Sequence, residues 1–184
     1  MDLQMVIVGL GGEGIIFMTR ILVEGFYRSG HPVISTETHG MAMRGGSVIS
    51  QIKIGNYQSP LIRYGEAGML LGTSEVEAQR NLPFLKKGGT VIMNTKGKGD
   101  HRIDATGIAH RLGNPRGGNL VLLGYALAHL APTITLKPFL GVTKELSPER
   151  FLSGNLGALK EGWQVGLKAN RGSLAKKSTD NQNA

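Results

Sequence analysis

Short apolar runs that end in glycine alternate with segments of helical periodicity in the first part of this chain. Residues 5–8 form such a run, Met-Val-Ile-Val, which stops at Gly9 and is typical of a strand buried on both faces of a parallel sheet. The next segment has apolar side chains on one helical face, at Ile15, Met18, Leu22 and Phe26. Gly30 ends this helix, and residues 31–35 begin a second strand. We therefore predict a right-handed βαβ unit with parallel strands.

The rest of the chain extends this pattern. Residues 47–54 alternate apolar with polar positions, which predicts a strand with one solvated face, added in the antiparallel sense. Residues 67–72 and 89–94 are further buried strands, with a helix beginning at about Ser74. Helices are predicted over 104–112, 119–130 and 147–167, the last with Pro148 in its first turn. The expected class is α/β, a Rossmann-like three-layer fold with a mainly parallel mixed sheet.

Length and composition narrow the classes of protein. The 184 residues fit one domain, which we place at 1–167, followed by a polar, basic and frayed tail over 168–184. The absence of Cys removes thiolate nucleophiles, disulfides and Cys-ligated clusters. Because no apolar run approaches the ~20 residues of a membrane span and the start lacks a signal-peptide pattern, we expect a cytoplasmic protein without membrane contact.

The first glycine-rich segment follows the first strand directly. Gly9, Gly11 and Gly14 fit the spacing G-x-G-x-x-G, in a position where backbone N–H groups and a helix dipole favour an anion. Gly12 and Glu13 add a glycine and a carboxylate, and the carboxylate would repel a pyrophosphate unless it points away. A nucleotide site and a glycine turn needed only for tight packing both remain open. The acid that would hold a ribose, Glu37, comes late for this pattern.

The second glycine-rich segment follows the second strand, so we expect the two segments to form one site. It contains His39, Gly40, Arg44, Gly45 and Gly46, with Met41 and Met43 between them. Two roles are open for Arg44: its planar fork grips a carboxylate or phosphate, or it pairs with Glu13 or Glu37. His39 has no nucleophile at motif spacing, so we interpret it as a hydrogen-bonded loop residue. We assign no catalytic or metal-ligating residue.

These two segments together resemble the signature pair of the gamma-type subunit of 2-oxoacid:ferredoxin oxidoreductases. The Thr38-His39-Gly40-Met41 form is most similar to the beta subunit of indolepyruvate ferredoxin oxidoreductases. Later landmarks of the family are matched in order by Gly113, Asn114, Pro115, Arg116, Asn119, Gly124, Asn155, Ala158 and Gly162. One departure is Glu13, where the family commonly has Gln.

The resemblance implies a subunit that is inactive alone, with 1–167 as its gamma-type domain. Thiamine diphosphate, Mg and the iron–sulfur clusters would belong to a larger catalytic partner, and ferredoxin would be reached through the complex, which converts a 2-oxoacid to its acyl-CoA. Contact with coenzyme A and a homodimer are further expectations. The candidate cofactor-binding residues are those of both segments: Gly9, Gly11, Gly12, Glu13, Gly14, His39, Gly40, Arg44, Gly45 and Gly46.

Two alternatives come from the residues themselves. A stand-alone NAD(P)-dependent dehydrogenase would use the first glycine segment for pyrophosphate and Glu37 for ribose. A basic nucleic-acid-binding module would draw on the net charge of +8 and on Lys86, Lys87, Lys96 and Lys98. We rank the nucleic-acid module last and expect no nucleic-acid partner, because five Phe, four Tyr and one Trp offer few stacking platforms.

Overall fold

The computed structural model describes residues 1–40, 45–97, 99 and 101–180. Met41, Met43 and Arg44 lie outside the described residues, as do Lys98 and the end of the predicted tail, 181–184. The helices and strands run along the chain as β1 (Leu3–Leu10), α1 (Ile15–Arg28), β2 (Val33–His39), β3 (Ser47–Ile54), β4 (Ala67–Gly72), α2 (Glu75–Arg80), β5 (Leu85–Asn94), β6 (Arg102–Ile103), α3 (Ala105–Arg111), α4 (Gly118–Ala128), α5 (Lys137–Leu146) and α6 (Glu149–Asp180), with short 3-10 turns at Leu82–Phe84 and Pro115–Gly117.

The sheet is mixed, with the strand order β2-β3-β1-β4-β5-β6. The pairs β1–β4, β4–β5 and β5–β6 are parallel, whereas β3 is antiparallel to both β1 and β2. The predicted antiparallel addition is confirmed. It lies between β1 and β2, which therefore run in the same direction without being neighbours.

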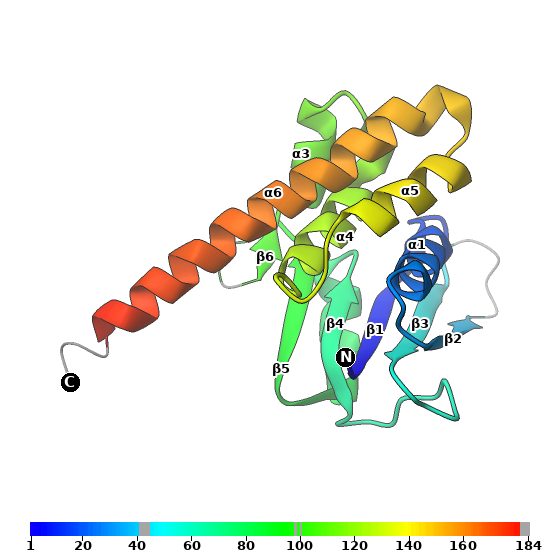
Figure 1. The fold of residues 1–184 in the computed structure, drawn as a ribbon, viewed down its shortest axis with the longest axis vertical. Coiled ribbons are helices and arrows are strands. Elements are labelled where there is room, and N and C mark those ends of the chain that lie inside the picture. Colours follow the sequence, from blue (N-terminus) through cyan, green and yellow to red (C-terminus); the bar gives the residue numbers. More distant parts are fainter. Residues whose placement is uncertain (41–44, 98, 100, 181–184) are drawn as a thin grey trace.

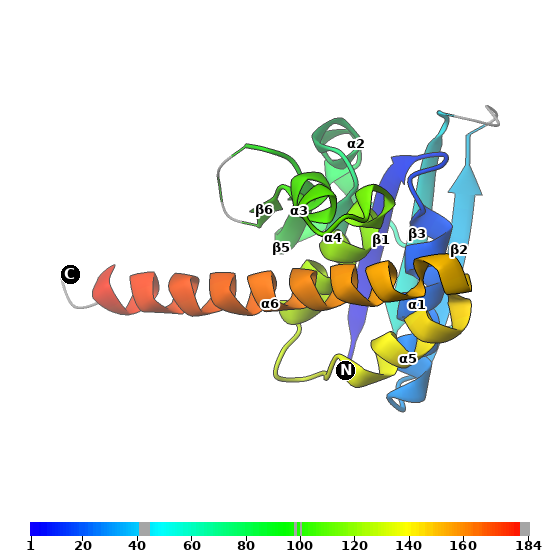
Figure 2. The ribbon, with the colours of Figure 1, turned by 90° about the horizontal axis from the view of Figure 1, so that it is seen from above.

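Helices cover the sheet on both sides, which confirms the expected three-layer α/β class. Figures 1 and 2 show α1, α4, α5 and α6 on one face, and the contacts of Ala78 place α2 on the other. Strand β1 is buried on both faces: Met5 and Ile7 join the larger core under α1 and α4, while Val6 and Val8 join a smaller core with Ala78 of α2. The four positions predicted for the inner face of α1 are all buried.

The C-terminal half differs from the prediction in two elements. Helix α5 was not predicted, although its buried Phe139 contacts Phe26 of α1 edge to face, with ring centroids 5.1 Å apart.

The second difference is at the end of α6. Residues 168–180 continue this helix instead of forming a frayed tail, so that expectation was wrong for this part. The Asn170 amide donates to the carbonyl of Ala128 at 2.9 Å, which holds the helix against α4 beyond the predicted end. Figures 1 and 2 show its last turns extending past the sheet.

Within the described residues, no helix combines the length and the hydropathy that crossing a bilayer requires. Strand β5 begins four residues earlier than predicted. Its first residues include Lys86 and Lys87, whose side chains are exposed. Strand β6 is a two-residue strand at the sheet edge, paired in parallel with the end of β5.

Candidate functional site

The two glycine segments meet at the carboxyl end of β1. The Gly11 N–H donates to the Gly46 carbonyl at 2.8 Å, and the Gly40 N–H donates to the Ser47 carbonyl at 2.9 Å. In the sheet, Val48 of β3 is paired with Gly9 on one side and with His39 on the other. The described parts of the two segments therefore lie side by side, and their forming one site stays a prediction. This edge is also where chain connections from β1 and β4 diverge, the usual place for a ligand in an open α/β sheet.

Close packing explains two glycines of the first segment. A Cβ on Gly9 would lie 2.0 Å from Thr73 Oγ1, and one on Gly14 would lie 2.1 Å from Asn119 Nδ2. Gly12 and Gly14 also have φ of 100° and 80°, in the left-handed region that side chains disfavour. The segment therefore packs tightly against β4 and α4, as the packing interpretation of the motif requires.

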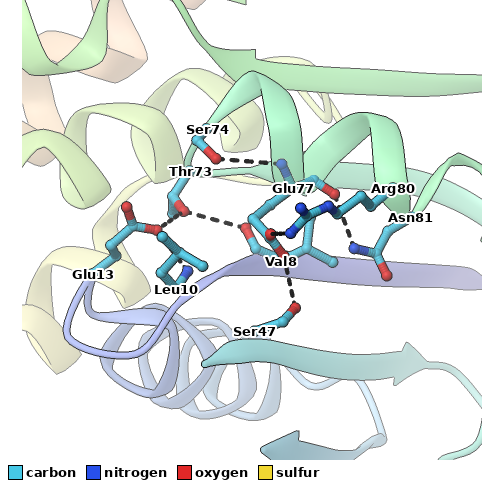
Figure 3. A network of polar contacts seen from close by, with 9 residues as sticks. All are labelled: Val8, Leu10, Glu13, Ser47, Thr73, Ser74, Glu77, Arg80 and Asn81. Atoms are coloured by element: carbon cyan, nitrogen blue, oxygen red, sulfur yellow. Dashed lines mark hydrogen bonds and ion pairs between the residues drawn. The ribbon is translucent and has the colours of Figure 1, made fainter. Parts of the chain in front are cut away.

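The Glu13 carboxylate is turned toward the protein. Its Oε2 accepts a hydrogen bond from the Leu10 N–H at 2.7 Å and another from the Thr73 hydroxyl. Figure 3 shows this side chain bridging the glycine segment to the residue that follows β4. One carboxylate oxygen is thus satisfied internally, which reduces the repulsion that a bound anion would meet.

A cavity of about 520 Å³ opens beside this carboxylate. Two helices begin at its wall, α1 after Gly14 and α4 after Gly117, and neither of these glycines offers a side chain as a cap. In α4, the Leu120 N–H already donates to Asn119 Oδ1 at 2.8 Å. Exposed Arg116 adds a positive charge. The remaining N–H groups of the two helix starts, the helix dipoles and a guanidinium favour an anionic ligand. The lining is Gly12, Glu13, Gly14, Thr73, Asn94, Thr106, Pro115, Arg116, Gly118, Asn119 and Leu122.

A second cavity, also of about 520 Å³, lies on the other side of the first glycine segment. Its wall is mainly apolar and includes Ile16, which is 47% exposed. Arg20 and His39 line it as well. His39 lies at the exposed end of β2, and no hydrogen bond of its ring is found among the described residues. The interpretation of His39 as a hydrogen-bonded loop residue stays a prediction.

The position of β3 weakens the dinucleotide interpretation. In the dinucleotide fold, the acid that holds the ribose ends the strand next to the glycine loop. Here β3 separates β2 from β1, which places Glu37 about two strand spacings, roughly 10 Å, from β1. Glu37 is also exposed. The residue pattern fits NAD(P) poorly in space as well as in sequence.

Of the second segment, Gly40, Gly45 and Gly46 are described and Arg44 is not. Gly45 has φ of 73°, which explains a glycine at that turn. The sequence also missed polar residues at this site. Thr73 and Ser74 follow β4, and buried Glu77 of α2 binds the Ser47 hydroxyl at 2.6 Å. In the sequence, only the position of Thr73 and Ser74 directly after a buried strand indicated such a role.

The later landmarks build the α4 and α6 region. The Asn114 amide donates to Asn155 Oδ1 at 3.3 Å, and the Asn155 amide donates to the Ser147 hydroxyl at 3.0 Å. Gly124 and Gly162 allow the two helix backbones to touch. Pro115, Arg116 and Asn119 line the first cavity, so this part of the resemblance contributes to the site.

Sequence comparison identifies the family. A profile described as pyruvate ferredoxin/flavodoxin oxidoreductase matches residues 4–165. The chain belongs to this family. Indolepyruvate oxidoreductase subunit IorB of Archaeoglobus fulgidus is 30% identical over 194 residues, covering 91% of this chain and 96% of that relative. The subunit of the same name from Methanothermobacter thermautotrophicus is 29% identical, covering 89% and 97%.

Solved structures confirm the fold. The keto/oxoacid ferredoxin oxidoreductase gamma subunit of Geobacter sulfurreducens superposes with a TM-score of 0.74 at 22% identity, covering 90% of this chain and 99% of that one. A 2-oxoglutarate:ferredoxin oxidoreductase from Magnetococcus marinus, with 2-oxoglutarate, coenzyme A and succinyl-CoA bound, gives 0.73 at 21% and matches over 31% of its length. Neither the dehydrogenase nor the nucleic-acid-binding alternative gains support from these relatives.

Proposed function

We propose that this chain is the non-cluster subunit of an oxidoreductase that acts on indolepyruvate or a related 2-oxoacid. The observation that supports the substrate class is the 30% identity to a subunit named for indolepyruvate, which extends over nearly the full length of both chains. In the proposed reaction, the 2-oxoacid loses CO₂, two electrons pass to ferredoxin, and the acyl group is transferred to coenzyme A.

The side chains agree with the division of labour that the family resemblance implies. The sequence contains no Cys, and the described residues contain no group of three or more His, Asp or Glu that could hold a metal ion. We therefore assign thiamine diphosphate, Mg and the clusters to a larger catalytic subunit. The role proposed for this chain is to contact that subunit and a ligand through the glycine segments.

The first cavity fits the phosphate groups of coenzyme A. The N–H groups at the starts of α1 and α4, apart from that of Leu120, and the Arg116 guanidinium would hold them. Glu13 has one oxygen bound to Leu10 and Thr73, which lowers its capacity to repel a phosphate. Coenzyme A is the acyl acceptor, and the site residues of this chain bind and orient its anionic end.

Purification tests the subunit assignment. A tagged chain, captured under anaerobic conditions from its native host, should bring down a larger Cys-rich subunit that contains thiamine diphosphate. The complex should reduce a viologen dye with indolepyruvate and coenzyme A, whereas the chain alone should be colourless and inactive. Turnover by the isolated chain would exclude the proposal, as would recovery of the tagged chain without such a subunit.

Calorimetry on the isolated chain tests the ligand. Coenzyme A should bind, and Arg116→Gln should weaken binding by about ten- to a hundredfold, since a charge-assisted hydrogen bond contributes about 1.5–3 kcal/mol. Arg63→Gln is the matched control, because Arg63 is exposed in the loop before β4 and outside the cavity lining. Tighter binding of NAD(P) than of coenzyme A would favour the dehydrogenase instead.

A further inference from the structure

Glu77 in the first turn of α2 is a charged residue with only 1% of its surface exposed. The sequence Ser74-x-x-Glu77 is a capping box, in which the glutamate carboxylate normally returns to the N–H of the capping residue. Half of the box is present, because the Ser74 hydroxyl accepts from the Glu77 N–H at 3.3 Å. The carboxylate takes another direction.

Both carboxylate oxygens are bound outside the capping box. The Ser47 hydroxyl donates to Oε2 at 2.6 Å, and Arg80 donates to Oε1 at 2.8 Å. Figure 3 shows the side chain reaching from α2 to the start of β3. The Arg80 side chain is 67% exposed, whereas that of Glu77 is 2% exposed. The positive charge that compensates the buried Glu77 carboxylate therefore lies at the protein surface. Burying a carboxylate is costly unless its partners are well placed.

Ser47 is the junction of the two glycine segments. Its carbonyl accepts from the Gly40 N–H, and the adjacent Gly46 carbonyl accepts from the Gly11 N–H. In the sheet it is paired with Leu10, which immediately precedes the first glycine segment's turn. One side-chain hydrogen bond from α2 therefore holds the residue on which both segments converge.

The first segment is held from the same place. Glu13 binds the Thr73 hydroxyl, and Thr73 lies four residues before Glu77 in the turn that leads from β4 into α2. Each glycine segment thus has one carboxylate contact to this turn, Glu13 for the first and Glu77 for the second. The turn is anchored in the sheet, because the Thr73 N–H donates to the Val8 carbonyl at 3.0 Å.

We propose that Glu77 is a positioning residue, which acts through Ser47 and the adjacent Gly46 carbonyl to fix the first glycine segment at the cavity for coenzyme A. This inference rests on the proposed function. A glutamate needed only to begin α2 would complete the capping box, whereas here its charge strengthens a bond to a segment 30 residues earlier in the chain.

Hydrogen exchange on the isolated chain tests the positioning itself. Ser47→Ala and Glu77→Ala should each raise the exchange rates of the Gly11 and Gly40 amides about tenfold, the change expected for the loss of one charge-assisted hydrogen bond. Glu77→Gln keeps an acceptor for Ser47 without the charge and should restore part of the protection that Glu77→Ala loses. Glu75→Gln is the control, since Glu75 lies in the same turn but binds Thr95 and Arg102. Unchanged exchange in folded Ser47→Ala would overturn the proposal.

Kinetics of the reconstituted complex test the consequence. Ser47→Ala and Glu77→Ala should each raise the KM for coenzyme A about tenfold while the KM for the 2-oxoacid stays within about twofold, and Glu77→Gln should raise the KM for coenzyme A less than Glu77→Ala does. A lower melting temperature with an unchanged KM for coenzyme A would show a purely structural role and overturn the inference. If the wild-type complex turns over no 2-oxoacid, the proposed function fails, and the exchange measurement still decides whether Glu77 positions the segments.

Discussion

The carbonyl oxygen of Val121 lies 2.0 Å from the point where a Cβ on Gly162 would stand. Gly124 stands in the same relation to the Leu159 carbonyl, at 2.2 Å. Helices α4 and α6 therefore touch backbone to backbone. On α6, the contact is made by small residues at four-residue spacing, Ala158, Gly162 and Gly166, which form a ridge that packs against the neighbouring helix.

This contact predicts a large loss of stability for Gly162→Ala. The added methyl must push two backbones apart, and overpacking of this kind costs about 1–3 kcal/mol, occasionally more. A thermal melt should therefore fall by several degrees, at about 2–4 °C per kcal/mol for a chain of this size. Gly157→Ala is the control in the same helix, since a Cβ there meets nothing within 4 Å, and it should stabilise by up to about 1 kcal/mol. Equal melts for the two variants would contradict this packing.

The sequence predicted the elements whose pattern is local. The buried strand β1 and the inner face of α1 follow from runs and periodicity of a few residues. Helix α5 was missed because Gly141 and its polar positions obscure the apolar pair Phe139 and Val142. The position of β3 between β1 and β2 was also outside reach, since strand order depends on pairing between distant segments.

Glu13 should tolerate replacement by its neutral amide, Gln. Glu13→Gln keeps one oxygen that accepts from the Leu10 N–H and the Thr73 hydroxyl, so the melting temperature should change little. Glu13→Ala removes this acceptor and should cost about 1–3 kcal/mol, because a partly buried donor loses its partner. Chemical denaturation measures both, with Glu161→Ala on the exposed face of α6 as the neutral control. A larger loss for Gln than for Ala would contradict this role.

In the candidate site too, some features could be predicted from the sequence and others could not. The meeting of the two glycine segments follows from chain order, because each comes after a strand of one βαβ unit. The contacts that hold them could not be predicted, since Thr73 and Glu77 are 60 and 30 residues from their partners in sequence. A polar residue at the end of a buried strand indicates the edge of the sheet but not the side chain it will meet.

His129 should make the protein less stable in acid. Its Nδ1 donates to the Tyr125 carbonyl at 2.9 Å, so Nε2 is the acceptor toward Nδ1 of His101, also at 2.9 Å. Burial lowers the pKa of His129 from its ordinary 6.5, the Tyr125 carbonyl raises it, and nearby His101 lowers it further. The folded state therefore disfavours the proton that the unfolded chain accepts, and stability present above about pH 6.5 is lost as the pH falls through the lowered pKa.

Melts at a series of pH values check this sign. From about pH 7.5 to about pH 5, His129→Asn should lose less of its melting temperature than the wild type, because Asn keeps a donor for the carbonyl and does not titrate. His110→Asn, on the exposed face of α3, should follow the wild type. Wild-type stability that rises on acidification, or identical slopes in all three proteins, would show that His129 does not set the pH dependence.

Arg44 should act on a ligand or partner and not as half of a buried ion pair. It lies outside the described residues, but its two candidate carboxylates are placed: Glu13 Oε2 binds Leu10 and Thr73, and Glu37 is exposed. Arg44→Lys keeps the charge and loses the bidentate fork, so it should weaken turnover of the assembled complex while the melt of the isolated chain stays unchanged. Were Arg44 to neutralise a buried carboxylate, Arg44→Ala would instead cost about 3–5 kcal/mol. Melting temperature and turnover, measured on the same two variants, separate these roles. If neither quantity changes in either variant, both roles are excluded.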